Sequence, residues 1–140
     1  MNKTLLFVLS LCLVGCQRYY VSGMQQKIDP SYLASSQVGT PDPRQANPPF
    51  GEALIISWKL PQNIMKRKPF CSLQVIYKDY TEDTFYHNVD YKTGSWKYSL
   101  LNEKFRERKG ILTYRIEIIT EDGEVYREWK HQLWVNLIEL

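Results

Sequence analysis

The chain has 140 residues, with 18 lysines and arginines against 15 aspartates and glutamates, a formal net charge of +3 and 44% hydrophobic residues. This length and apolar content predict one packed domain, with room for a linker. The basic excess is small and scattered, which argues against nucleic acid as a partner, since such proteins carry a clustered basic patch.

The first 15 residues have the pattern of a secretory signal. Lys3 precedes an apolar run from Leu5 to Val14, which is too short to span a bilayer as a helix, since that takes about 20 residues. Leu13-Val14-Gly15-Cys16 resembles the lipobox of bacterial lipoproteins, which implies cleavage before Cys16 and a lipid on its thiol. The alternative is an ordinary signal peptide cut near Gly15.

The lipoprotein resemblance implies a location. A diacylglyceryl thioether on Cys16, usually with a third acyl chain, anchors firmly, because stable attachment takes two or more chains. In enteric-type lipoproteins an aspartate after the cysteine favours inner-membrane retention, so Gln17 favours the outer membrane. We therefore expect a protein of the bacterial cell envelope that is held on the membrane through Cys16, with an envelope protein as partner.

Residues 16–49 are predicted to form the lipidated N-terminus and a Pro/Ser-rich linker. The stretch is polar and without period, and it contains Asp29-Pro30, Ser35-Ser36 and Pro41-Asp42-Pro43. Proline lacks an N–H and restricts the residue before it, so an extended tether is expected. The alternative is that Ser31–Gly39, which includes apolar side chains, is ordered against the domain or a partner.

Residues 50–140 are predicted to form an all-β domain, because apolar residues alternate in short segments bounded by turn signals. The expected strands are Leu54–Leu60, Cys71–Lys78, Phe85–Tyr91 and Trp96–Leu100. Gln62–Pro69 is predicted as a loop, and Asn102–Lys109 as a helical turn or polar loop that Gly110 ends.

The last two strands are predicted to be a hairpin, Ile111–Glu121 with Glu124–Leu137, around Asp122-Gly123. A two-residue loop sets a register in which apolar residues share one face. The expected opposite pairs are Ile118 with Arg127, Ile116 with Trp129, Tyr114 with His131 and Leu112 with Leu133. Glu117 then faces Glu128, an unfavourable pair that the diagonal neighbours Arg115 and Lys130 offset.

Several short strands without a long helix predict a β-sandwich. Leu54–Pro61 resembles the second strand of fibronectin type III domains, with its inward Trp58 and closing proline. Leu73–Tyr77 is similar to the third strand, and Gly110–Ile118 to the penultimate strand with its inward tyrosine. The resemblance implies an immunoglobulin- or fibronectin-type sandwich over roughly residues 50–135. It departs from the family because no first strand is evident before Leu54 and the last strand is too long.

Candidate chemistry is sparse. Cys12 leaves with the signal and Cys16 carries lipid, so Cys71 has no disulfide partner. Cys71 with His87 or His131 is the one nucleophile–base pairing available, but no catalytic signature surrounds it. Glu82, Asp83 and Asp90 lack the dense oxygen spacing of a calcium loop. We predict no enzyme activity, no cofactor and no metal, with a cysteine-dependent enzyme as a remote alternative.

Two surfaces are candidates for binding. Tyr126 and Trp134 fall on the outward face of the last predicted strand, where they form a partner-binding stripe unless the linker or a second sheet covers them. Lys66, Arg67 and Lys68 are either a solvated tip or a contact with an anionic surface; Arg106, Arg108 and Lys109 form a second basic tip.

We predict a non-catalytic envelope lipoprotein that binds protein or envelope material; the alternative is an accessory lipoprotein of a secretion or outer-membrane assembly complex.

Overall fold

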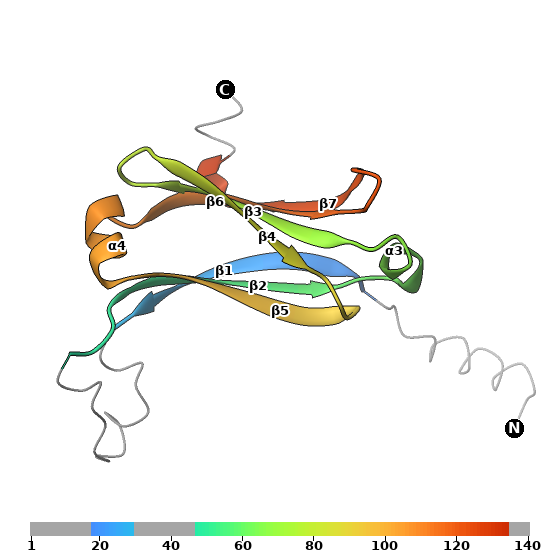
Figure 1. Cartoon of the computed structure of the whole chain (residues 1–140), viewed down its shortest axis with the longest axis horizontal. Coiled ribbons are helices and arrows are strands. Elements are labelled where there is room, and N and C mark those ends of the chain that lie inside the picture. Colours follow the sequence, from blue (N-terminus) through green and yellow to red (C-terminus); the bar gives the residue numbers. More distant parts are fainter. Residues whose placement is uncertain (1–17, 30–46, 135–140) are drawn as a thin grey trace, which may run out of the picture.

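The computed structural model describes residues 18–29 and 47–134 as two antiparallel sheets packed face to face, with a short helix at each end (Figure 1). The predicted β-sandwich is therefore confirmed. The elements in chain order are β1 (Tyr20–Ile28), β2 (Gly51–Lys59), α3 (Gln62–Met65), β3 (Phe70–Tyr77), β4 (Glu82–Asn88), β5 (Thr93–Leu101), α4 (Asn102–Arg108), β6 (Ile111–Ile119) and β7 (Val125–Lys130).

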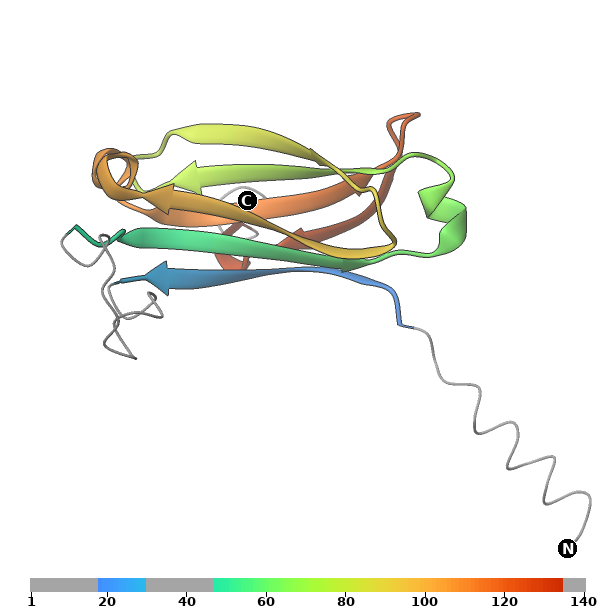
Figure 2. The same cartoon turned by 60° about the horizontal axis from the view of Figure 1, so that its bottom comes forward.

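The sheets have the strand orders β1-β2-β5 and β4-β3-β6-β7. On one long side of the sandwich the edge strands β1 and β7 approach each other, and Arg127 donates a hydrogen bond to the carbonyl of Tyr19. On the other long side lie the edge strands β4 and β5 (Figure 2). Their inward side chains meet across the gap between the sheets.

The predicted linker is wrong for Tyr20–Ile28, which is the first strand of the domain. β1 pairs with β2 along its whole length, from Tyr20 opposite Lys59 to Ile28 opposite Gly51. Only Val21 and Ile28 of this strand are buried, so it lacks the alternation by which strands are recognised. The domain therefore begins four residues after Cys16. The segment Ser31–Gly39 lies outside the described residues.

The core is built from the faces that the sequence predicted. Leu54, Ile56, Trp58 and Leu60 are buried from β2 and its end, and they face Leu73, Val75 and Tyr77 of β3 and Tyr114, Ile116 and Ile118 of β6. Each such side chain contributes about 1.5–3 kcal/mol when it is fully buried. The Trp58 indole N–H donates to the carbonyl of Tyr91 at 3.0 Å, so its polar atom is satisfied at the core edge.

The final hairpin keeps its predicted register through a different loop. Ile118 lies opposite Arg127 and Ile116 opposite Trp129, as expected. The loop has three residues, because the Thr120 N–H donates to the Glu124 carbonyl at 2.9 Å, and Gly123 takes a φ of 85°. A bulge at Tyr126 absorbs the extra residue, which restores the register.

One further detail of the hairpin differs from the prediction, and another agrees with it. β7 ends at Lys130 and residues 132–134 form a helical turn, so the expected pairing of Leu112 with Leu133 is wrong; residues 135–140 lie outside the described part. Glu117 and Glu128 do face each other. Glu117 forms an ion pair with Arg115 at 3.1 Å, and Glu128 forms one with Lys130 at 3.3 Å, each along its own strand.

Candidate functional site

The side of the sandwich between β4 and β5 is closed by aromatic rings, which we call the aromatic seam: Phe85 and His87 of β4, and Trp96 and Tyr98 of β5. The His87 and Trp96 rings are stacked with centroids 5.0 Å apart, and the Phe85 and Tyr98 centroids lie 4.7 Å apart. All four side chains are only partly buried. The seam therefore joins the two sheets and is also accessible from solvent.

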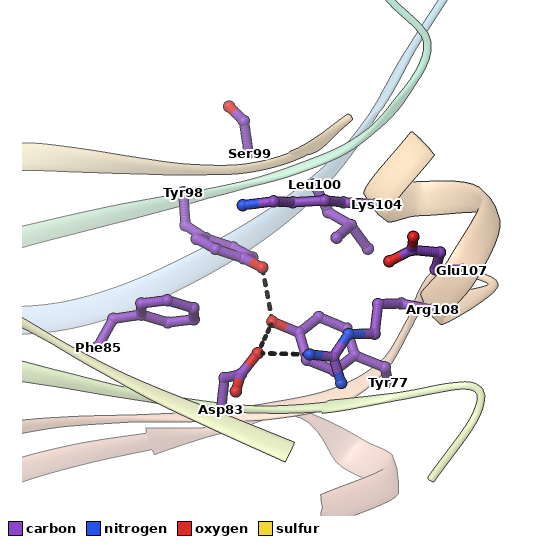
Figure 3. A pocket seen from close by; sticks show the side chains of 9 residues that line it. All are labelled: Tyr77, Asp83, Phe85, Tyr98, Ser99, Leu100, Lys104, Glu107 and Arg108. Carbon is purple, nitrogen blue, oxygen red and sulfur yellow. Dashed lines mark hydrogen bonds and ion pairs between the residues drawn. The ribbon is translucent and has the colours of Figure 1, made fainter. Parts of the chain in front are cut away.

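A hollow of about 210 Å³ opens at the α4 end of the seam (Figure 3). Its wall contains residues from three strands and one helix: Tyr77, Asp83, Phe85, Tyr98, Ser99, Leu100, Lys104, Glu107 and Arg108. Lys104 and Glu107 project from α4 on one side of the view, and Tyr77 and Asp83 lie on the other. The hollow is smaller than the roughly 300–1,000 Å³ of typical small-molecule sites.

The polar groups of this hollow bind one another. The Tyr77 hydroxyl lies 2.7 Å from that of Tyr98 and 3.1 Å from the Asp83 carboxylate. Arg108 donates to the same carboxylate oxygen at 3.3 Å and to the Thr81 hydroxyl, and its guanidinium lies 4.8 Å from the Tyr77 ring centroid. Figure 3 shows the bonds that join Tyr98, Tyr77, Asp83 and Arg108 as dashed lines.

Burial is the main cause that raises the pKa of both phenols, Tyr77 and Tyr98. For Tyr77 the hydrogen bond between its hydroxyl and that of Tyr98 and the nearby Asp83 charge raise the pKa further. Both hydroxyls are therefore protonated at neutral pH. The cluster can donate and accept hydrogen bonds, and it holds α4 against β3 and β4, but it offers no activated oxygen nucleophile.

The outer edge of β4 is the second feature of this side. Among the described residues no strand pairs with that edge. Three exposed tyrosines follow it: Tyr80 just before the strand (84% exposed), Tyr86 within it (68%) and Tyr91 just after it (77%). The Tyr86 ring packs edge-on against Phe70, with centroids 6.0 Å apart. Exposed aromatic side chains of this kind are enriched at protein interfaces.

Sequence reasoning missed both features. Tyr77, Asp83, Tyr98 and Arg108 lie on different elements and meet only through the sandwich. The exposed edge had a signal in the sequence, because Tyr86 lies between two inward residues of an alternating strand and must therefore face outward.

Cys71 and His87 are opposite each other on β3 and β4. The Cys71 side chain is fully buried, and burial raises the pKa of its thiol to about 12. In the described part of the chain no hydrogen bond joins that thiol to the imidazole, whose ring instead stacks on Trp96. His131 stacks on Tyr114, with centroids 5.4 Å apart. A thiol in this setting is not a nucleophile at neutral pH.

The predicted stripe of Tyr126 and Trp134 is wrong for Trp134. This side chain is only 2% exposed, because the chain leaves the strand after Lys130 and folds back over the outer face of β6. There the Arg115 guanidinium lies 5.0 Å from the Trp134 ring centroid. Tyr126 is partly buried at the bulge, beside Arg127. The two aromatic side chains therefore do not form an exposed stripe.

The predicted basic tip is largely paired with acidic residues. Arg67 bonds to Asp122 at 2.7 Å and to Glu124 at 2.6 Å, and Lys68 lies 3.8 Å from Glu121. The Thr120 hydroxyl and then the Arg67 guanidinium lower the pKa of Asp122. The tip thus ties the α3 loop to the last hairpin, and it leaves Lys66 exposed. Arg106 and Arg108 of the second tip are likewise paired, with Glu103 and Asp83.

Cys16, the predicted lipid attachment site, lies outside the described residues. Within the described residues no helix is long and apolar enough to cross a membrane, and no three His, Cys, Asp or Glu side chains come together as metal ligands would. Asp83 lies near the start of β4 and Asp90 just after its end, so these two carboxylates are not brought together.

No protein-family model matches the chain, and no curated protein is significantly similar to it.

Proposed function

We propose that this protein is a non-catalytic, lipid-anchored binding module of the bacterial cell envelope, and that an extended segment of an envelope protein binds along the free edge of β4. The observation that carries the proposal is this edge: no described strand pairs with the outer side of β4, and exposed tyrosines lie before, within and after the strand. Adding a strand to a sheet edge is a common way to bind an extended peptide, because the main-chain hydrogen bonds supply affinity.

β4 lacks most of the features that protect sheet edges from pairing. Proline, lysine and bulges serve that purpose in other proteins. β4 contains neither proline nor lysine, and it pairs with β3 in unbroken register. Its inward charge, Asp83, lies near one end and is bound by Tyr77 and Arg108. The edge strand of the same sheet on the other side, β7, is bulged at Tyr126 and lies beside β1.

The tyrosines add contact surface to the backbone edge. A tyrosine contributes a large apolar ring and a hydroxyl at a small entropic cost, since it has only two side-chain torsions. Tyr86 is held against Phe70, so its ring is already placed for contact. A partner strand beside β4 would pack against Tyr86 at its centre and against Tyr80 and Tyr91 at its ends.

The hollow of Figure 3 favours binding over catalysis. It is small, and its phenols, carboxylate and guanidinium are bonded to each other, so a substrate would have to displace those contacts. The anchor rests on the lipobox that ends in Cys16, and Gln17 favours the outer membrane. The order of strands supports the fibronectin type III resemblance, since the segments compared with its second, third and penultimate strands are β2, β3 and β6 of seven. That resemblance concerns the fold and assigns no function.

Photo-crosslinking in intact cells tests the proposal. A crosslinker in place of Tyr86 should capture one envelope protein, while a crosslinker in place of Ser95, exposed on the other sheet, should not. Tyr86→Lys should abolish capture from the neighbouring position Thr84, since a charged side chain on an edge opposes pairing. Met24→Lys is the matched control, because Met24 is exposed on the outer face of β1. Equal capture from Tyr86 and Ser95, or capture that survives Tyr86→Lys, contradicts the proposal.

A further inference from the structure

The chain between the anchor and the domain is short, and this limits which end of the domain can lie near the membrane. Four residues lead from Cys16 to Tyr20, where β1 begins, and an extended chain spans at most about 3.6 Å per residue. With lipid on Cys16, as in the proposed function on which this inference rests, the start of β1 lies within about 14 Å of the anchored residue. The headgroup layer on each side of a bilayer is about 5–8 Å thick. The end of the domain that carries β1's first residue and α3 therefore lies at the headgroups.

A hollow of about 420 Å³ is open at this end. It is lined by Tyr19, Lys59, Leu60, Gln62, Lys92 and Thr93. Tyr20, Lys59 and Thr93 are opposite one another on the three strands of the smaller sheet, on its outer face. The loop before β5 is fixed at this point, because the Leu60 N–H donates to the Lys92 carbonyl at 2.7 Å.

The charge of this hollow is of one sign. Its wall holds two ammonium groups, from Lys59 and Lys92, and no carboxylate. Neither lysine forms an ion pair within the described residues. Three other hollows of the described part each include a carboxylate: Asp122, Asp83 and Asp90 respectively. The Gln62 amide and the Thr93 hydroxyl add hydrogen-bond donors beside the two cations.

Exposed aromatic residues border the same hollow. Tyr20 is partly exposed, and Tyr91, next to Lys92, is largely exposed. Tyrosine is enriched where proteins meet the membrane–water interface, since its ring is apolar and its hydroxyl is polar. This combination suits the binding of an acidic lipid headgroup at a membrane surface: two lysines, hydrogen-bond donors and flanking tyrosines.

We propose that this hollow, the anchor-side cleft (Tyr19, Lys59, Gln62, Lys92 and Thr93), binds the phosphate of an anionic phospholipid in the leaflet that holds the lipid on Cys16. Each lysine near an anionic surface strengthens membrane contact about fivefold, so the pair contributes about 25-fold. The cleft thereby fixes the orientation of the anchored domain, with the α4 end away from the bilayer. In Figure 1 the two helices lie at opposite ends of the sandwich.

The test uses the lipidated full-length protein in vesicles of phosphatidylcholine, with or without phosphatidylglycerol. Acetylation of individual lysines is followed by mass spectrometry. Lys59 and Lys92 should be acetylated at least about fivefold more slowly when phosphatidylglycerol is present. Lys78 and Lys104, exposed at the other end, should react equally in both. A crosslinker in place of Gln62 should attach to lipid, and Lys59→Gln/Lys92→Gln should remove the preference of this attachment for phosphatidylglycerol. The control Lys78→Gln/Lys104→Gln carries the same charge change and should retain it.

The outcomes separate this proposal from the anchor. If the protein floats with vesicles but Lys59 and Lys92 react as fast as Lys104, the cleft proposal is overturned while the anchor stands. If the protein does not float with vesicles, the anchor itself fails. If soluble glycerol phosphate protects the two lysines without vesicles as well as phosphatidylglycerol membranes do, the cleft is a site for free anions, which overturns the membrane assignment.

Discussion

Gly23→Ala tests whether β1 belongs to the domain or to a tether. A Cβ at this position would lie 2.6 Å from Ile116 Cδ1 and 2.8 Å from Tyr114 Cε2. Both neighbours are buried in β6, so neither can move aside without disturbing the core. Overpacking of this kind costs about 1–3 kcal/mol. Alanine also reduces the entropy of the unfolded chain, which returns about 0.4–1 kcal/mol.

The net expectation for Gly23→Ala is a loss of about 1–2 kcal/mol in the free energy of unfolding. For a domain of about 100 residues this lowers the midpoint of thermal unfolding by about 4–12 °C. The assay is thermal unfolding followed by circular dichroism. Ser22→Ala is the matched control, because Ser22 lies on the outer face of the same strand, opposite Ser57, and its midpoint should stay within about 2 °C. If residues 20–28 were a tether, Gly23→Ala would be neutral or slightly stabilising, and such a result would refute the reasoning.

Three other outcomes are expected. Tyr77→Phe should lower the free energy of unfolding by about 1–3 kcal/mol in urea denaturation, because Tyr98 and Asp83 lose a partly buried partner. The control Tyr86→Phe changes an exposed position and should alter the free energy of unfolding by less than about 0.5 kcal/mol. The Cys71 thiol should resist iodoacetamide at pH 8 in the folded protein and react after unfolding, since burial raises its pKa to about 12; rapid alkylation of the folded protein would disprove its burial. Stability should be insensitive to this thiol below its ordinary pKa of 9.0 and should fall between 9.0 and about 12, where only the unfolded thiol ionises, by up to about 1.4 kcal/mol per pH unit. Cys71→Ala should reduce the slope of stability against pH in that range, and an unchanged slope would contradict the assignment.

Alternation of apolar residues was enough to place the strands that bury one continuous face. β2, β3 and β6 repeat large apolar side chains at every second position, so both their faces and their membership of a sandwich were predictable. β1 has no such signal. Its pairing with β2 makes it a strand, and Gly23 is small because β6 passes close beneath it.

The hairpin shows why register is easier to predict than loop geometry. The burial of Ile116 and Ile118 fixes which residues face inward, and this requirement holds for either loop. The chain satisfies this requirement with a three-residue turn and a bulge at Tyr126. The pair Asp122-Gly123 does not specify that combination. Trp134 was misplaced for a related reason: alternation was extended past Lys130, where the ladder ends.

The candidate sites depend on neighbours that are distant in sequence. Tyr77, Tyr98 and Arg108 meet only because α4 closes one end of the sandwich. Lys59 and Lys92 come together because β2 and β5 are adjacent strands. None of this is visible in local sequence pattern.

We propose that the sandwich domain is attached to a membrane through Cys16, a few residues before its first strand. Mass spectrometry of the mature N-terminal peptide from isolated membranes tests this most directly. We expect the peptide to begin at Cys16 and to carry the mass of a diacylglyceryl group, with or without a third acyl chain. An N-terminus at another residue, or an unmodified Cys16, would contradict it.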